Sequence, residues 1–373
     1  MKRHVTRFAI LLSIVYSFAV FAASTASIDR AITQQMKKSH IRGVSCCIIK
    51  NGQIVFSGQY GFTDPAGTMP VKSDTDFMLA SVSKTVTGVA LMTLYDQGKV
   101  KLDDPIAPYL KFPVVNPNFA GTPITFRMLL THTSSIQDSD KDDAYYTPGD
   151  SPISLEDFLA SYFTPGGSNY SAKNNFLDSA PGTVSEYSNV GVALVGYLVQ
   201  TISGKSFEDY CAQTIFKPLG MTNTAWRLAQ LDVTKVALPC TYDARTRKFT
   251  SDGNYGYPDI PNGALRTSVP ELAKFLQMFM GHGKYLDVRI LSESAAEEMA
   301  APQTALDPSQ GLVWYYDTVA KVKLLGHNGG DTGVSTDMFF DPLTGTGFIV
   351  LCNTDNDVAD TILPILLKAA RKL

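Results

Sequence analysis

Apolar positions fall into short, strand-like runs at both ends of the chain and into longer, helix-like runs between them. Near the N-terminus two apolar runs are joined at Asn51-Gly52, a dipeptide that strongly favours a tight hairpin turn. Both ends of the chain are therefore rich in predicted strands. These strands are Val44–Ile49, Gln53–Tyr60, Leu312–Tyr316, Val322–Leu325, Ser335–Phe340 and Gly347–Cys352.

In the middle of the chain the apolar positions recur with helical spacing. Long connections rich in Pro, Gly, Ser and Asp separate these segments, and residues 138–150 and 165–175 are the most loop-like. Two further helices, Ile28–His40 and Val358–Lys372, are predicted near the termini. The central helices are predicted at Val82–Gln97, Thr125–Leu130, Leu155–Tyr162, Val190–Ile202, Phe207–Ile215 and Pro270–Met280.

Strands at the two ends of a chain are not stable as isolated hairpins. The economical arrangement is one antiparallel sheet built from both termini, with the terminal helices packed on it. The predicted fold class is α/β of the α+β kind. The α/β part, which contains the sheet, spans about 27–90 and 260–373, and a mostly helical insertion spans about 91–259. We expect a ligand cleft where the two parts meet.

The charge balance excludes several classes of partner. The 373 residues carry 32 Lys and Arg against 35 Asp and Glu, so the chain lacks the basic footprint of a nucleic-acid-binding protein.

Residues 1–26 have the pattern of a signal peptide, because Lys2, Arg3 and Arg7 precede an uncharged run followed by small residues. We expect a secreted or periplasmic protein with no stable membrane span after cleavage; an uncleaved N-terminal anchor is the alternative.

The cysteines and the metal-binding motifs add little to the functional prediction. The five cysteines are too few for a disulfide scaffold and odd in number, and a pairing of Cys211 with Cys240 stays open. Cys46 and Cys47 are adjacent on a predicted strand, so we expect them on opposite faces, buried as small apolar residues. The sequence contains no Cys-x-x-Cys or His-Glu-x-x-His motif, and we predict neither a metal nor any other cofactor.

A candidate nucleophile stands at the start of the first central helix. Ser81 and Lys84 are three residues apart, so their side chains are neighbours on one helix face. A serine needs an adjacent base to be nucleophilic at neutral pH, and a lysine can be that base if burial lowers its pKa. A polar first turn on a buried helix is the simpler explanation of the same spacing.

Two later motifs could complete such a site. Tyr187 and Asn189 lie on a loop at the mouth of a predicted helix, where a tyrosine can shuttle protons. Asn189 could instead merely cap the helix.

Gly329 and Gly330 follow His327 between two predicted strands, where paired glycines let a backbone approach a ligand. A main-chain N–H there, together with that of Ser81, would form an oxyanion hole; a glycine-rich turn is the alternative.

Ser-x-x-Lys, then Tyr-x-Asn, then a basic residue-x-Gly on a late strand resembles the group of serine hydrolases that contains class C β-lactamases and D-alanyl-D-alanine carboxypeptidases. The resemblance covers the chain from about Ile28 to its end and implies a β-lactamase/transpeptidase-like fold. Further landmarks that look like the family's are Gly43-Val44-Ser45, Phe77-Met78-Leu79-Ala80, the segment 124–135, and Pro218-Leu219-Gly220-Met221.

The resemblance implies a role for each motif residue. Ser81 would be the acylated nucleophile, and Lys84 and Tyr187 the proton-transfer pair, with the choice of base between them left open. Asn189 would contact a substrate amide, His327 would match the family's basic residue, and Gly330, next to Gly329, would be the second oxyanion donor. His132 lies in the 124–135 landmark, which implies a structural hydrogen-bonding role for it.

One departure bears on function. Class C β-lactamases carry Lys-Thr-Gly where this chain has His327-Asn328-Gly329, and a histidine is only partly cationic near pH 7. His327 would therefore hold a substrate carboxylate less firmly than a lysine. The resemblance implies a serine hydrolase acting on a small molecule or peptide with an amide or ester bond. A carboxylesterase, or a catalytically idle penicillin-binding-like protein on the same fold, is the alternative.

Overall fold

The computed structural model describes residues 25–139 and 145–373. The predicted signal peptide, 1–26, lies outside the described residues except for its last two positions, and it remains a prediction. No helix in the described ranges is both long enough and apolar enough to cross a membrane.

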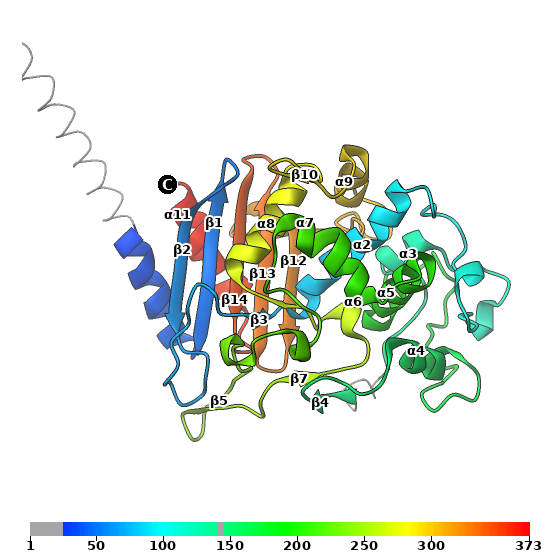
Figure 1. Ribbon diagram of the computed structural model, residues 1–373, viewed down its shortest axis with the longest axis horizontal. Coiled ribbons are helices and arrows are strands. Elements are labelled where there is room, and N and C mark those ends of the chain that lie inside the picture. The colour runs from blue at the N-terminus through cyan, green and yellow to red at the C-terminus, as the bar shows by residue number, and fades with distance from the viewer. Residues whose placement is uncertain (1–24, 140–144) are drawn as a thin grey trace, which may run out of the picture.

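A six-stranded sheet in the order β11-β12-β13-β14-β1-β2 forms the centre of the molecule (Figure 1). Every neighbouring pair is antiparallel, and β1 from the N-terminal part pairs with β14 from the C-terminal part, with Val44 opposite Cys352. The prediction of one antiparallel sheet built from both termini is therefore confirmed. The strands are β1 Gly43–Lys50, β2 Gln53–Gly61, β11 Tyr315–Val319, β12 Val322–Asp331, β13 Val334–Asp341 and β14 Thr346–Cys352.

Two predicted strand boundaries were wrong. The run Leu312–Tyr316 is not a strand as a whole, because β11 begins only at Tyr315 and Val313 has a φ of 55°. Its apolar residues fill the core from an irregular segment, so their hydrophobicity reflects burial and not strand formation. The prediction Val322–Leu325 was too short, since β12 continues to Asp331.

The sheet buries both of its faces, and side chains alternate between two cores as the pleat requires. Cys47 packs in the core on the side of α8, whereas its neighbour Cys46 packs in the core under the terminal helices. This confirms their predicted placement on opposite faces of one strand. All five cysteines are free and buried, which excludes a bond between Cys211 and Cys240.

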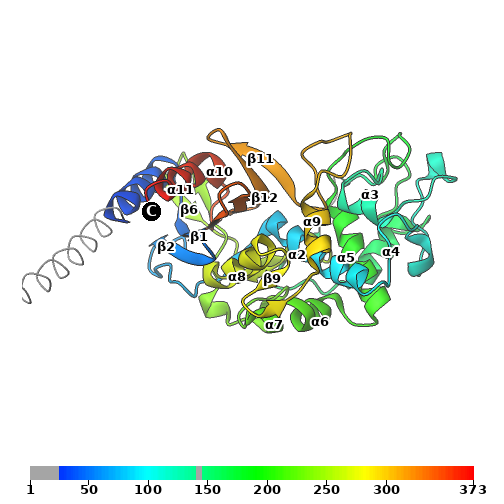
Figure 2. The ribbon, with the colours of Figure 1, turned by 90° about the horizontal axis from the view of Figure 1, so that it is seen from above.

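Helices cover the two faces unequally. The helix over residues 25–38, α10 (Val358–Thr361) and α11 (Leu363–Ala370) lie on one face, and α8 (Val269–Met280) lies on the other (Figure 2). Both terminal helices were thus placed correctly, although the C-terminal one is broken around Ile362.

The central helices gather beyond one end of the sheet, around the contact between α2 and α5 (Figure 1). The predicted helix Phe207–Ile215 is α6 followed by a π-helical segment, Ala212–Phe216, and the alanine-rich α9 was not predicted. The limits of the predicted insertion, about 91–259, remain a proposal. The helices are α2 Ser83–Asp96, α3 Phe126–Leu130, α4 Leu155–Phe163, α5 Asn189–Ser203, α6 Phe207–Cys211, α7 Lys217–Leu219 and α9 Glu293–Ala300.

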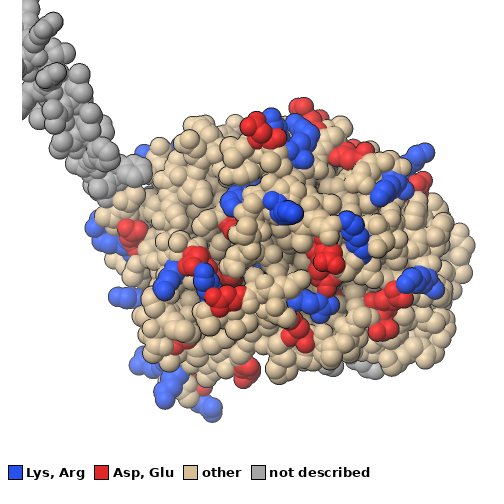
Figure 3. Space-filling model, viewed as in Figure 1, with Lys and Arg blue, Asp and Glu red and all other residues tan. Residues whose placement is uncertain are grey.

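Short elements complete the chain between these parts. The paired strands are β3 Phe77–Met78 with β8 Arg266–Thr267, β4 Thr147–Pro148 with β7 Tyr255–Gly256, β5 Thr241–Asp243 with β6 Lys248–Thr250, and β9 Lys284–Tyr285 with β10 Val288–Arg289. Turns of 3₁₀ helix lie at Ala80–Val82, Ala107–Tyr109, Pro117–Phe119, Leu228–Gln230, Val233–Lys235 and Ile260–Asn262. Basic and acidic side chains are interspersed on the face that Figure 3 shows.

Candidate active site

Ser81 lies in the 3₁₀ turn Ala80–Val82, immediately before α2. The preceding residue, Ala80, has a φ of 47°, a left-handed conformation that is rare for a residue with a Cβ. The turn is held in place because the N–H of Leu79 donates to the carbonyl of Leu265 across the small β3–β8 sheet, 2.8 Å apart. Backbone strain of this kind is typical of functional sites, and here it positions a partly exposed serine.

Lys84 is completely buried beneath Ser81. Its Nζ lies 3.0 Å from Ser81 Oγ, 2.7 Å from Asn189 Oδ1 and 2.8 Å from the carbonyl oxygen of Asn262. Burial lowers the pKa of Lys84 to about 7, although nearby carboxylates, that of Asp138 foremost, act in the opposite direction. A substantial fraction of this amine is therefore neutral near physiological pH.

Tyr187 approaches the serine from the cavity side. Its hydroxyl donates to Ser81 Oγ at 2.8 Å, and its ring centre lies 5.0 Å from Lys84 Nζ. The residue as a whole is 44% exposed, but removal of its hydroxyl from water raises the pKa of Tyr187, and the bond to Ser81 lowers it by less. The tyrosine is consequently a neutral phenol at physiological pH.

The mouth of α5 is held by a residue that the sequence did not single out. Asp138 accepts hydrogen bonds from Ser188 Oγ at 2.9 Å, from the N–H of Asn189 at 2.8 Å and from the N–H of Val190 at 3.0 Å. A carboxylate at a helix N-terminus satisfies free backbone donors and interacts well with the helix dipole. It fixes the position from which Asn189 reaches Lys84. Ser188, and not Asn189, is the N-cap residue of α5.

His132 orients Tyr187 and lies beneath it. The two rings stack with their centres 4.5 Å apart, and His132 Nδ1 accepts the N–H of Ser188 at 3.1 Å. Burial, with a smaller contribution from Lys84, lowers the pKa of His132 to about 3, so the ring is neutral. These contacts agree with the structural role expected for this histidine.

The segment from His327 to Gly330 lies inside β12, and not in a turn. β11 pairs with β12 only as far as Gly326, so the following residues pair with β13 alone and leave one edge facing Ser81. A Cβ on Gly329 would lie 2.4 Å from the carbonyl oxygen of Leu79 and 3.0 Å from the nitrogen of Ser81. Only glycine fits there, whereas a Cβ on Gly330 would meet nothing within 4 Å.

His327 differs from the expectation of a partly cationic anchor. Its side chain is buried, and burial, together with the charge of Lys84, lowers the pKa of His327 to about 3. Its Nδ1 lies 2.5 Å from the carbonyl oxygen of Asn328, which a neutral ring satisfies by carrying its proton on Nδ1. The imidazole is therefore uncharged at neutral pH, and the expectation was wrong because the sequence does not reveal its burial.

A cavity of about 400 Å³ opens in front of Ser81. Tyr187, His327 and Gly330 line it, and so do Gln310 and Tyr315, which the sequence did not indicate. No lysine or arginine is among its lining residues in the described part of the chain. Of the predicted site residues, Ser81, Tyr187, His327 and Gly330 line this cavity. Lys84 and Asn189 lie behind Ser81, and Gly329 lies beside it.

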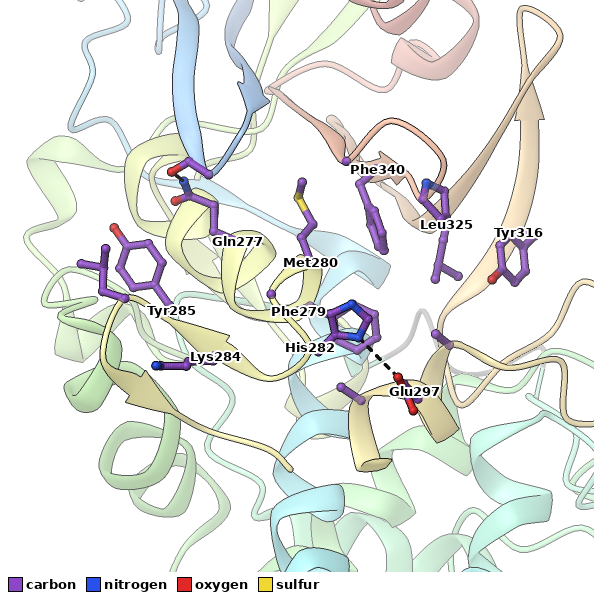
Figure 4. Close-up of a pocket in the computed structure, with 17 residues that line it drawn as sticks. Gln277, Phe279, Met280, His282, Lys284, Tyr285, Glu297, Tyr316, Leu325 and Phe340 are labelled. Atoms are coloured by element: carbon purple, nitrogen blue, oxygen red, sulfur yellow. Dashed lines mark hydrogen bonds and ion pairs between the residues drawn. The ribbon is translucent and has the colours of Figure 1, made fainter. Parts of the chain in front are cut away.

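A larger cavity, of about 460 Å³, lies elsewhere between α8, β9 and α9 (Figure 4). None of the predicted site residues lines it, and its floor is mainly apolar, so it offers no comparable chemistry. His282 and Glu297 line it. Together with Glu293 they have ligand atoms within 4.8 Å of one another, but all three side chains are exposed.

Comparisons with known proteins show the family of the chain. A family model described as Beta-lactamase matches residues 28–371. Protein flp of Staphylococcus aureus is 25% identical over 335 residues, which cover 90% of this chain; the chain spans 64% of the length of flp.

Solved structures share the fold. The D-amino acid amidase from Ochrobactrum anthropi superposes with a TM-score of 0.73 at 21% identity, over 93% of this chain and 99% of the amidase chain. The D-alanine carboxypeptidase AmpC from Burkholderia cenocepacia gives a TM-score of 0.70 at 21% identity, over 94% and 99% of the two chains.

Proposed function

Because the chain belongs to the beta-lactamase family of serine hydrolases, we propose that Ser81 forms an acyl-enzyme with an amide or ester substrate, which water then hydrolyses. The observation that carries this proposal is the contact of Ser81 Oγ with two proton-transfer groups at once. Lys84 Nζ lies 3.0 Å away and the hydroxyl of Tyr187 lies 2.8 Å away.

Lys84 is the better candidate for the base that takes the serine proton. A neutral amine donates two hydrogen bonds and keeps one lone pair. The oxygens of Asn189 and Asn262, at 2.7 and 2.8 Å, accept the two donated bonds, which leaves the lone pair for the hydroxyl of Ser81. A lysine pKa of about 7 is also close to the value that general-base catalysis favours.

The attack places a negative charge on the substrate oxygen. The N–H groups of Ser81 and Gly330 are proposed to bind this oxyanion, and the close approach of Gly329 to Ser81 supports that role. As the tetrahedral intermediate collapses, the bond from the carbonyl carbon to the leaving nitrogen or oxygen breaks. Tyr187, which donates to Ser81 Oγ from the cavity side, would deliver the proton that the leaving group needs and take one back from the Lys84 ammonium, so that both groups are again neutral before water attacks.

The cavity favours substrates without a carboxylate next to the scissile bond. His327 is neutral, and no lysine or arginine lines the cavity within the described ranges. These observations favour a carboxylesterase or amidase with uncharged substrates as the more specific function. Hydrolysis of β-lactams and D-alanyl-D-alanine peptides, both of which bear a carboxylate, is the alternative. Secretion is a further proposal, which rests on residues 1–26.

Mass spectrometry of the intact protein tests the mechanism. The protein is incubated separately with a short-chain ester, a β-lactam and a D-alanyl-D-alanine peptide, and the acyl adduct is mapped to a peptide. We expect an adduct on Ser81 with the ester, none in Ser81→Ala, and an unchanged adduct in Ser294→Ala, which removes an exposed hydroxyl on α9. Labelling of Ser81→Ala at the wild-type rate would contradict the mechanism.

A further inference from the structure

The cavity in front of Ser81 is lined by one charged side chain that the proposed mechanism does not use. Asp307 lines it from the irregular segment before β11 and is half-buried. No lysine, arginine, glutamate or second aspartate of the described ranges lines this cavity, and His327 is neutral. The charge of the cavity wall is therefore negative, which suits a positively charged group of a substrate.

One oxygen of Asp307 is held in place and the other is open. Oδ1 accepts a hydrogen bond from the N–H of Ser309 at 2.9 Å and another from the Ser309 hydroxyl at 2.7 Å. Oδ2 has no partner in the described part of the chain, and it is not shielded from solvent. A carboxylate accepts bonds on both oxygens, so Oδ2 can receive a donor from a substrate.

Gln310 supplies a second acceptor next to Asp307, to whose carbonyl oxygen its N–H donates at 3.1 Å. Gln310 is only 8% exposed and lines the same cavity, and its Nε2 donates to the carbonyl oxygens of Gly311 at 2.9 Å and Trp314 at 3.3 Å. These two bonds fix the orientation of the amide, because only its nitrogen can donate. Its Oε1 has no partner among the described residues but is open to solvent, so it too can accept a donor.

The two acceptors lie on the side of the cavity to which the leaving group would extend. The ring centre of Tyr187, the proposed proton donor to that group, lies 6.3 Å from the ring centre of His327, which lies 5.1 Å from that of Tyr315. Tyr315 pairs with Gln310 through an isolated β-bridge. This row of residues leads from the proton donor to Gln310 and Asp307, so a leaving group that follows it ends at two oxygen acceptors.

The chemistry of the acceptors selects the kind of ligand. An ammonium group carries N–H donors and no acceptor, and its hydrogen bond to a carboxylate is strengthened by charge. An alcohol could donate to the same oxygens but would gain nothing from the charge of Asp307, and a carboxylate would be repelled by it. A few well-placed polar groups of this kind commonly fix the orientation of a ligand in a pocket.

We propose that Asp307 and Gln310 bind an ammonium group on the leaving group of the substrate, so that the enzyme prefers esters and amides of amino alcohols and diamines. Asp307 would supply the charge and accept through Oδ2, and Gln310 would accept through Oε1. The inference rests on the proposed function and deepens it, because it selects, among substrates without a carboxylate, those with a cationic leaving group.

Hydrolysis of matched esters by the full chain tests the proposal. Acetate esters of dimethylamino alcohols, with spacers of two to six carbons, are compared at pH 7 with neutral esters in which a CH group replaces the protonated nitrogen. At the best spacer length we expect KM of the cationic ester to be about fivefold lower, the upper range for a partly exposed ion pair, and high salt to reduce this preference. A preference at no spacer length would overturn the proposal.

Variants of Asp307 show whether its charge causes the preference. Asp307→Asn keeps the shape of the side chain without its charge, so the two esters should have nearly equal KM. Asp307→Glu restores the charge on a longer side chain and should move the optimum to a shorter spacer. Asp287→Asn removes an exposed carboxylate from the turn between β9 and β10 and should keep the wild-type ratio of KM values. A wild-type ratio in Asp307→Asn would refute the site.

Binding to Ser81→Ala separates a failure of this inference from a failure of the proposed function. NMR titration of this variant with the best cationic ester and with its neutral counterpart measures affinity without hydrolysis. We expect Kd of the cationic ester to be about fivefold lower. Equal Kd values would overturn the ammonium site even if the wild type hydrolyses both esters. Selective binding in this variant, with no acyl adduct on Ser81 of the wild type, would support the ammonium site and contradict the proposed function.

Discussion

Lys84 and Asp337 are both buried ionisable side chains: Lys84 contacts Ser81, and Asp337 stands opposite Asn328 of β12 in the sheet register. Lys84 has three oxygen atoms within 3.0 Å of its Nζ, whereas Asp337 has no partner within the described residues. Burial disfavours the charged form of both groups, so the pKa of Lys84 falls and that of Asp337 rises.

The difference shows two ways in which a fold accommodates a buried ionisable group. Burial lowers the pKa of Lys84 to about 7, where it can exchange protons with Ser81, and three oxygen atoms remain in hydrogen-bond contact with its amine. Asp337 has no such bonds within the described residues and its neighbours are acidic, so protonation of its carboxyl removes the buried charge. A perturbed pKa alone does not distinguish a candidate catalytic group from a buried group that is merely kept neutral; the hydrogen-bond partners do.

Removing the amine of Lys84 should give the largest effect. Lys84→Met keeps an unbranched side chain of similar length but supplies no base, so we expect the acylation rate to fall by about a thousandfold or more, within the upper range of general-base contributions. Stopped-flow acylation by a chromogenic ester measures this loss. In the wild type the rate should rise with pH through about 7, as Lys84 loses its proton. A variant with more than a tenth of the wild-type rate would rule out Lys84 as the base.

The same variant tests the pKa through stability. The pKa of Lys84 is about 7 in the folded chain and has an ordinary value of 10.5, so the unfolded chain binds more protons between these pH values. The destabilising contribution of Lys84 is complete below about pH 7 and disappears as the pH rises towards 10.5. Denaturant unfolding should therefore show that Lys84→Met gains most stability, relative to the wild type, at pH 6. An advantage that is independent of pH would contradict a lowered pKa.

Two neighbouring glycines on β12, beside Ser81, offer a matched pair. Gly329→Ala places a Cβ 2.4 Å from the carbonyl oxygen of Leu79, so we expect a loss of about 1–3 kcal/mol in unfolding free energy. Displacement of β12 from Ser81 should also lower kcat by roughly a hundredfold. Gly330→Ala, whose Cβ would meet nothing within 4 Å, should retain stability. Equal loss of stability in the two variants would show that the close approach at Gly329 is unimportant.

Tyr187→Phe should have a smaller effect than loss of Lys84. It removes the hydroxyl that donates to Ser81 but keeps the ring stacked on His132. We expect kcat to fall by about a hundredfold while Tm stays within experimental error. Amide substrates should lose more than activated esters, because a poor leaving group depends more on the proton. An unchanged acylation rate with an amide would reduce Tyr187 to a packing role.

The sequence predicted the parts of the site that depend on local spacing. Ser81 and Lys84 are one helical turn apart, Tyr187 precedes α5 and Asn189 is its first residue, so motif order and helix geometry were enough to identify them as candidates. Asn262 and Asp138 were not found, because each acts through contacts with segments distant in sequence.

Burial limited the remaining predictions. The run that begins at Leu312 is apolar because it fills the core, and it resembles a strand only in composition. The charge state of His327 and the isolation of Asp337 also depend on which neighbours exclude water.

The smallest effect should come from titration of His327. Finding almost no effect of this kind on KM would be informative. With a pKa of about 3, the ring stays neutral from pH 5 to pH 9, so it provides no charge that appears as the pH falls. KM for an acidic ester and for a matched neutral ester should therefore follow the same pH profile over this range. His327→Lys, if the longer side chain reaches the cavity, should lower KM for the acidic ester alone, because it introduces the cation that the cavity lacks. If KM of the wild-type enzyme for the acidic ester fell selectively between pH 7 and pH 5, His327 would be titrating in that range. Its imidazolium would then be a substrate anchor, and burial would control its charge less strongly than it controls that of Lys84.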